Sequence, residues 1–210
     1  MDASHVCLVS IVWPCEKFKK YTCNEWVRVG VHIGNLLKLL KFSHKSDAVT
    51  FSLLESTSDH LVVTFHDEHR SAEFSLKLIA REDEAMDVPE FAHGADLCMD
   101  ADEFSVVCKD LSNIADTLTL TVDATGLLMH ASGDIGTATI GYDNLEMRQC
   151  TELTQSFALR YLNSFAKGCA LASKVTLRMT QDMPLVIEYA NDASYLTFYL
   201  APKLDDDVDV

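Results

Sequence analysis

The 210-residue sequence lacks the motifs that mark many enzyme and metal sites. It contains no glycine-rich phosphate loop, no G-x-S-x-G nucleophile elbow and no H-E-x-x-H zinc motif. Its seven cysteines form no C-x-x-C pair, and an odd number with scattered spacing indicates neither a zinc ribbon nor a disulfide framework. We therefore expect no catalytic residue, no metal and no cofactor, with reduced thiols in an intracellular protein.

Long apolar runs and positive charge are also scarce. No apolar run is long enough to cross a bilayer, so we expect no membrane partner. Lys and Arg together number 17 against 32 Asp and Glu, which gives a net charge of −15. Taken alone, this balance argues against nucleic acid, because phosphate binding needs a basic surface. The 48% of hydrophobic residues is typical of a globular chain.

One pattern occurs three times along the chain. Each copy begins with a short segment whose apolar residues have helical spacing, and three short stretches rich in β-branched and aromatic residues follow it. The helical segments cover residues 35–41, 103–114 and 156–167. Two further strands are predicted at residues 6–13 and 26–33, joined by the polar connection P-C-E-K-F-K-K-Y-T-C-N-E. The pattern predicts an α+β fold of repeated units, each a short helix with antiparallel strands.

The basic residues collect on these predicted helices. The first carries Lys38 and Lys41, the third carries Arg160 and Lys167, and neither contains an acid, whereas Lys109 on the second has acidic neighbours. Acids fill the connections and the tail. Two interpretations remain open: a basic strip that holds DNA inside an acidic body, or the solvated sides of ordinary amphipathic helices.

Residues 80–94 predict an exposed linker between two domains, because this stretch is acidic, contains Pro89 and has no sustained period. We expect a first domain at residues 1–79, a second at 95–203, and an acidic tail at 204–210. The apolar residues inside the linker either pack locally or form one wall of a binding groove.

A histidine cluster, H-D-E-H at residues 66–69 with His60 nearby, has two interpretations. It is either a polar hairpin tip or part of a metal site. We favour the hairpin tip, because metal sites need converging ligands that this spacing does not secure.

Several long stretches carry a resemblance to a known family. They are F-A-L-R-Y-L-N-S-F-A-K, M-P-L-V-I-E-Y and Y-L-A-P-K near the carboxyl end, E-F-S-V-V-C-K-D-L-S-N-I-A-D and H-A-S-G-D-I-G before them, and the opening M-D-A-S-H-V-C-L-V. These stretches resemble the proliferating cell nuclear antigen family, the eukaryotic DNA sliding clamps. The resemblance implies the DNA clamp fold with two similar domains per subunit. It also implies a homotrimeric ring in the nucleus, with helices lining the hole and sheets outside.

The resemblance implies two sets of ring residues. Matches to basic positions of the inner face, or neighbours of them, would bind the phosphates of double-stranded DNA without sequence preference: Lys38, Lys41, Lys109, Arg160 and Lys167. Edge strands at residues 71–78 and 135–142 would pair between subunits, with interface residues Phe74, Leu76, Leu78, Ile135, Thr137 and Thr139.

A third implied set forms a groove for short peptide motifs of partner proteins. Its residues would be Met1, His5, Val6, Leu8, Met86, Val88, Pro89, Pro184, Tyr199, Leu200, Ala201 and Pro202. The implied partners are DNA polymerase, flap nuclease, ligase, clamp loader and repair proteins, including those of mismatch repair and translesion synthesis. The clamp itself would catalyse nothing and would raise processivity by tethering.

The chain also departs from the family pattern. The family's first strand, its first pore helix and the strands after that helix have no counterpart, so we expect the first domain to lack this unit, through truncation or a wrongly assigned start. The lysine that the family modifies matches Ala124, so we expect no modification there. Two other functions remain: a form that binds client peptides without closing a ring, and an enzyme using the histidines near His66.

Overall fold

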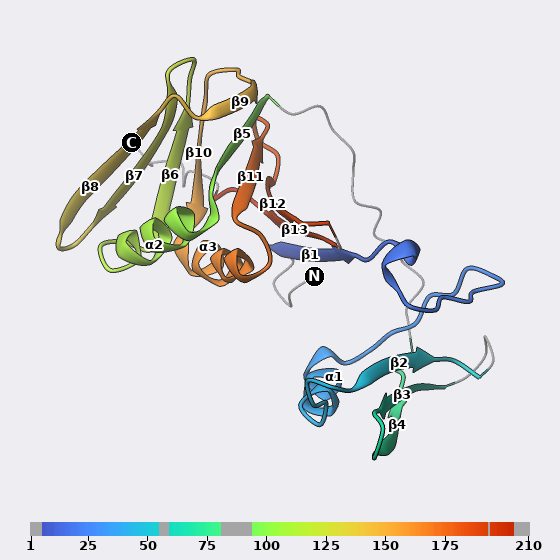
Figure 1. Cartoon of the computed structure of the whole chain (residues 1–210). Helices are drawn as coiled ribbons and strands as arrows, with labels where there is room; N and C mark the ends of the chain where they lie inside the picture. Colours follow the sequence, from blue (N-terminus) through green and yellow to red (C-terminus); the bar gives the residue numbers. More distant parts are fainter. Residues whose placement is uncertain (1–5, 55–58, 81–93, 193, 204–210) are drawn as a thin grey trace. The chain divides into compact units, whose positions relative to one another are not determined.

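The computed structural model describes residues 6–54, 59–80, 94–192 and 194–203 of the chain (Figure 1). The chain divides into two compact units, which we call unit 1 (Met1–Tyr21 and Glu90–Val210) and unit 2 (Thr22–Pro89). Among the described residues, no helix has the length and apolarity that a membrane span requires.

Unit 1 contains two antiparallel sheets. The six-stranded sheet has the order β1-β13-β12-β11-β5-β9, and the four-stranded sheet has the order β10-β6-β7-β8. The strands of the first sheet are β1 (Cys7–Val12), β5 (Ala95–Asp100), β9 (Glu146–Gln149), β11 (Lys174–Met179), β12 (Leu185–Ala190) and β13 (Tyr195–Leu200). Those of the second are β6 (Thr117–Val122), β7 (Gly126–Gly133), β8 (Gly136–Asp143) and β10 (Leu153–Ala158).

The helices α2 (Ala101–Leu111) and α3 (Leu159–Phe165), with the 3-10 helix η2 (Ala166–Ala170), lie beside one another against these sheets (Figure 1). The side chain of Asp100 caps α2 by accepting a 2.9 Å hydrogen bond from the Glu103 amide. Phe104, Val107, Cys108 and Leu111 are buried, which is the spacing of one helical face. Helix α2 is therefore stabilised both by its N-cap hydrogen bond and by burial of its apolar face.

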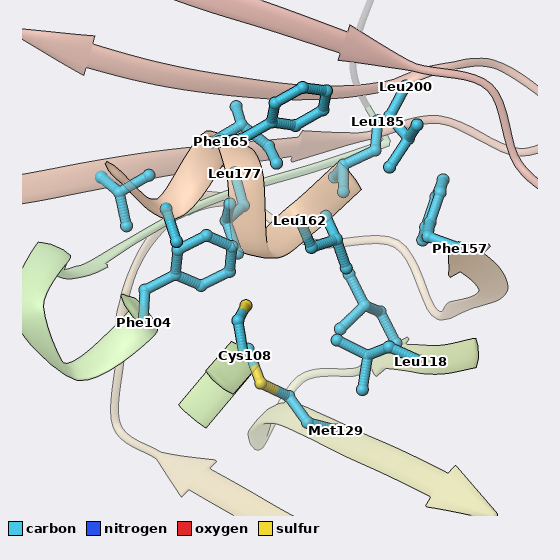
Figure 2. Packing of buried hydrophobic residues seen from close by; sticks show 14 of the residues in the cluster. Phe104, Cys108, Leu118, Met129, Phe157, Leu162, Phe165, Leu177, Leu185 and Leu200 are labelled. Atoms are coloured by element: carbon cyan, nitrogen blue, oxygen red, sulfur yellow. The ribbon is translucent and has the colours of Figure 1, made fainter. Parts of the chain in front are cut away.

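One hydrophobic core joins the helices of unit 1 to both sheets. Figure 2 shows Phe104 and Cys108 of α2 and Leu162 and Phe165 of α3 gathered with apolar strand residues such as Leu177. The rings of Phe165 and Phe198 stack with centroids 4.4 Å apart. Because β6 and β11 alternate buried and part-exposed residues, each strand gives one face to this core.

Unit 2 contains α1 (Ile33–Leu40) and a three-stranded sheet of order β2-β3-β4, made of β2 (Ala48–Ser52), β3 (His60–His66) and β4 (Ser71–Lys77). Its small core centres on Val63 and Phe65, both fully buried. Phe74 stacks on Phe42 at 5.1 Å and meets Phe65 edge to face at 5.7 Å.

The predicted repeated units are confirmed. Helix α1 precedes β2 to β4, α2 precedes β6 to β8, and α3 precedes β11 to β13. The strand predicted at residues 26–33 is wrong: within the described residues only Gly30 pairs there, as an isolated bridge with Ile79, and α1 begins at Ile33. The third helix begins later than predicted, because Ser156 and Phe157 pair with β6 and belong to β10.

Strand β1 pairs with β13 along its whole length, from Cys7 opposite Leu200 to Val12 opposite Tyr195. This pairing places the amino-terminal strand in the same compact unit as the carboxy-terminal strand. The domain boundaries expected from the sequence stay a prediction, and the linker and the tail lie mostly outside the described residues.

Candidate functional site

Three of the predicted DNA-binding residues lie on the helical layer of unit 1. Lys109 is on α2, Arg160 on α3 and Lys167 on η2, and all three are exposed. The three elements contact one another, so the three basic residues share one layer. Lys167 lies in a 3-10 helix, so a seven-residue α-helical spacing from Arg160 does not place the two side chains on one face.

The other two predicted DNA-binding residues lie in unit 2. Lys38 is in the last turn of α1, and Lys41 is its C-cap residue. Both are exposed, and α1 carries no acid. A base at the carboxyl end of a helix is favoured by the negative end of the helix dipole, which gives these positions a local structural reason as well.

Pairing of β1 with β13 brings together the described part of the predicted groove. The Ala201 amide donates a 2.9 Å hydrogen bond to the Val6 carbonyl, and Leu8 lies opposite Tyr199. Val6, Leu8, Tyr199 and Ala201 are partly exposed, as are Pro184 and Pro202. The Leu200 side chain is fully buried and points into the core (Figure 2). Met1, His5, Met86, Val88 and Pro89 lie outside the described residues.

A charged network that the sequence analysis did not identify lies on the same sheet face as Tyr199. Registered pairs place Tyr199, Val186, Arg178 and Asp96 in one row across four strands. Nη2 of Arg178 donates to Oε1 of Glu188 at 2.9 Å, and its Nε donates to Oδ2 of Asp96 at 3.3 Å. The one available signal was the strand alternation in K-V-T-L-R-M, which turns Arg178 away from the core.

This network sets the electrostatics beside the predicted groove. Glu188 is the largest cause of the raised pKa of Arg178, through its hydrogen bonds. Burial raises the pKa of Tyr199, and the charge of Glu188 raises it further. The sheet face that Tyr199 shares therefore carries two carboxylates, those of Asp96 and Glu188, and the Arg178 guanidinium that binds both.

The strands predicted at the subunit interface lie at sheet edges. Within the described residues, β8 pairs only with β7 and β4 only with β3. Ile135 is 76% exposed, and Thr137 and Thr139 are exposed too. Phe74 and Leu76 turn toward the core of unit 2, so backbone groups of β4 would make its edge contacts. The Leu78 amide donates a 2.8 Å hydrogen bond to the Asp59 carbonyl, just past the end of β4.

The predicted hairpin tip at residues 66–69 is confirmed. Strand β3 ends at His66 and β4 begins at Ser71, and the Asp67 amide donates to the Arg70 carbonyl at 2.9 Å. Backbone amides of His69 and Arg70 donate to the Asp67 carboxylate, and they hold its pKa below the usual range. Over the part of the chain that the structure describes, no three His, Cys, Asp or Glu side chains gather to hold a metal ion.

Comparisons with known proteins cover nearly the whole chain. Two family models match: "Proliferating cell nuclear antigen, N-terminal domain" over residues 1–87, and "Proliferating cell nuclear antigen, C-terminal domain" over residues 87–204. The proliferating cell nuclear antigen of Caenorhabditis elegans is 32% identical over 222 aligned residues, which cover 99% of this chain and 84% of that protein.

Proposed function

This chain belongs to the proliferating cell nuclear antigen family, so it is a sliding clamp and DNA polymerase processivity factor, and we propose that it encircles duplex DNA as a homotrimer in the nucleus. The family consists of clamps rather than enzymes, and it acts in DNA replication.

The two open edge strands carry the proposal of a closed ring. Strand β8 belongs to unit 1 and β4 to unit 2, so each chain offers two different edges. Pairing β8 of one copy with β4 of the next is a head-to-tail contact, and such contacts generate a ring when the rotation closes. Ile135 lies in the turn between β7 and β8, and its exposed side chain would pack against the neighbouring copy.

The exposed basic residues on the helices support non-specific DNA binding. Lys38, Lys41, Lys109, Arg160 and Lys167 would contact phosphates, which fix no sequence and allow sliding. An acidic exterior, in a chain of net charge −15, would discourage DNA from binding elsewhere.

The β1–β13 region supports a peptide site for client enzymes. Val6, Leu8, Tyr199, Ala201 and Pro202 offer a partly exposed apolar floor, which suits the aliphatic and aromatic anchors of a short motif. Polymerase, flap nuclease, ligase, clamp loader and repair factors would dock there. A docked client stays near DNA because tethering raises its effective concentration.

The experiment that tests the ring is multi-angle light scattering over a dilution series. The wild type is expected at three times the 23.4 kDa of one chain. Ile135→Asp puts an uncompensated charge into the proposed contact and should yield monomer, because burying an unpaired charge is strongly unfavourable. Leu171→Asp is the matched control, since this leucine is also exposed but lies at the end of η2, and it should stay trimeric.

A wild-type monomer at all concentrations would overturn the ring and leave only client-peptide binding. A trimer that survives Ile135→Asp would overturn the choice of β8 as the closing edge.

A further inference from the structure

The segment after β1 is a basic and aromatic loop in an acidic protein. Residues 14–21 read P-C-E-K-F-K-K-Y and contain Lys17, Lys19 and Lys20 against a single acid, Glu16. All but Pro14 are exposed, and that proline is half-buried. The helices of the proposed inner face include none of these lysines. We call this segment the basic loop.

The basic loop has a defined backbone. Pro14 precedes the 3-10 helix η1 (Cys15–Lys17), in which the Lys17 amide donates to the Pro14 carbonyl at 3.0 Å. The Phe18 amide then donates to the Cys15 carbonyl at 3.2 Å. These two hydrogen bonds close a tight turn at the start of the basic loop.

Two aromatic rings stand together on the basic loop. Phe18 and Tyr21 are 41% and 58% exposed, and their ring centroids lie 5.7 Å apart at an angle of 47°. Trp13, the residue just before the basic loop, is 59% exposed. Single exposed apolar residues are ordinary, but a cluster of aromatics among lysines is the composition of a ligand surface.

From this juxtaposition we infer that the basic loop binds single-stranded nucleic acid. Lys17, Lys19 and Lys20 neutralise successive phosphates, while Phe18 and Tyr21 stack on unpaired bases. Duplex DNA does not fit the aromatic part, because its bases are already stacked on one another and present only their edges. Aromatic platforms beside cationic side chains are the arrangement that single strands use, with little sequence preference.

The lysines of this surface lie on other elements of unit 1 than the proposed duplex-binding residues of that unit. The basic loop follows β1, an edge strand of the six-stranded sheet, whereas Lys109, Arg160 and Lys167 lie on α2, α3 and η2. A clamp with both surfaces holds duplex DNA through its helices and an unpaired strand through its basic loop.

The test is fluorescence anisotropy of a labelled oligothymidylate of about 20 nucleotides over a salt series. Lys19→Gln/Lys20→Gln in the full chain should bind at least tenfold more weakly. The slope of log affinity against log salt should fall by about 1.4, which is about 0.7 for each lost phosphate contact. Lys45→Gln/Arg148→Gln is the control of equal charge, at exposed positions of other segments, and should change neither quantity.

A second variant separates stacking from charge. Phe18→Ala/Tyr21→Ala should weaken oligothymidylate binding by about thirtyfold or more with an unchanged salt slope, because stacking is not electrostatic. Both positions are exposed, so thermal unfolding midpoints should match the wild type.

Three outcomes overturn the inference. The wild type fails to bind oligothymidylate, or the lysine variant and its control lose equal affinity for it. In the third outcome, the lysine variant loses affinity only for vesicles that contain phosphatidylserine, measured in parallel, and keeps its affinity for oligothymidylate. Failure of the clamp proposal is distinguishable, because Lys109→Gln/Arg160→Gln/Lys167→Gln should shorten retention on closed circular duplex and leave oligothymidylate binding intact.

Discussion

The hydroxyl group of Tyr142 donates a 2.8 Å hydrogen bond to Oε1 of Glu103. This bond ties the open edge strand β8 to the first turn of α2, the helix that carries Lys109. Burial raises the pKa of Tyr142, and the hydrogen bond to Glu103 and its charge raise it further. The proposed ring contact and the proposed DNA surface are thus joined through one pair of side chains.

We predict that Tyr142→Phe lowers the free energy of unfolding by about 1 kcal/mol, the usual net value of such a hydrogen bond. A raised folded-state pKa stabilises the fold below the ordinary tyrosine value of about 10, and this stabilisation is lost as pH rises through the folded value. The difference in the free energy of unfolding between wild type and variant, measured with urea, should therefore be smaller at pH 11 than at pH 7. Tyr195→Phe, at an exposed tyrosine, is the control. A difference that is constant with pH would contradict the assigned role of Glu103.

Arg178 should be the most sensitive charged position of the six-stranded sheet. Its side chain is 18% exposed, and Asp96 and Glu188 are 17% and 22% exposed. Arg178→Met leaves both carboxylates close together without a partner, and we expect a loss of about 2 kcal/mol in stability, below the cost of breaking a fully buried pair. Lys174→Met breaks the exposed pair with Glu146 and should leave the thermal midpoint unchanged. Equal effects of the two substitutions would count against the network.

Gly168 permits a close approach of η2 to the core. A Cβ atom there would clash with Cε2 and Cδ2 of Tyr189, a residue that is 1% exposed. We predict that Gly168→Ala costs about 1–3 kcal/mol through overpacking. A Cβ atom added at Gly141 would lie 3.7 Å from its nearest neighbour, Cδ1 of Leu128. Gly141→Ala should therefore leave the stability nearly unchanged. Chemical denaturation of both variants checks this, and an unchanged Gly168→Ala protein would refute the packing.

The seven thiols should react in the order of their exposure. Burial raises the pKa of Cys108 to about 12, and the thiolate is the reactive form. With Ellman's reagent at pH 8, the exposed Cys15, Cys23 and Cys150 should react at once, whereas Cys7 and Cys108 should react only on unfolding. Peptide mass mapping over time assigns each thiol. Early labelling of Cys108 would show that the apolar face of α2 is not packed into the core as described.

The peptide site should depend on one end of β13. Tyr199→Ala should weaken binding of a synthetic peptide with aliphatic and aromatic anchors by about thirtyfold, the scale of an interface hot spot. Tyr195→Ala is matched in residue type, strand and sheet face but lies at the other end of β13, opposite Val12, and should bind normally. Isothermal titration calorimetry measures both. Similar affinities for the two variants would place the peptide elsewhere.

The repeated helix and strand units were predictable because their signals are local. The apolar spacing of Phe104, Val107, Cys108 and Leu111 is visible in one helical turn after another, and the alternation in residues 117–122 is visible within one strand. The boundary error at the third helix has a non-local cause. Ser156 and Phe157 fit a helical spacing, but pairing with β6 took them into β10, and a window along the chain does not contain that partner.

The sequence by itself determined the repeated helix and strand units, the acidic balance, the collection of basic residues on helices, and the family to which the chain belongs. Only the tertiary structure decided that β1 pairs with β13, that Arg178 sits between Asp96 and Glu188, and that Leu200 turns into the core while Tyr199 turns out. The physical reason is that these contacts join residues far apart in the chain. Their energies depend on register between strands, whereas helical periodicity and charge depend only on neighbours in sequence.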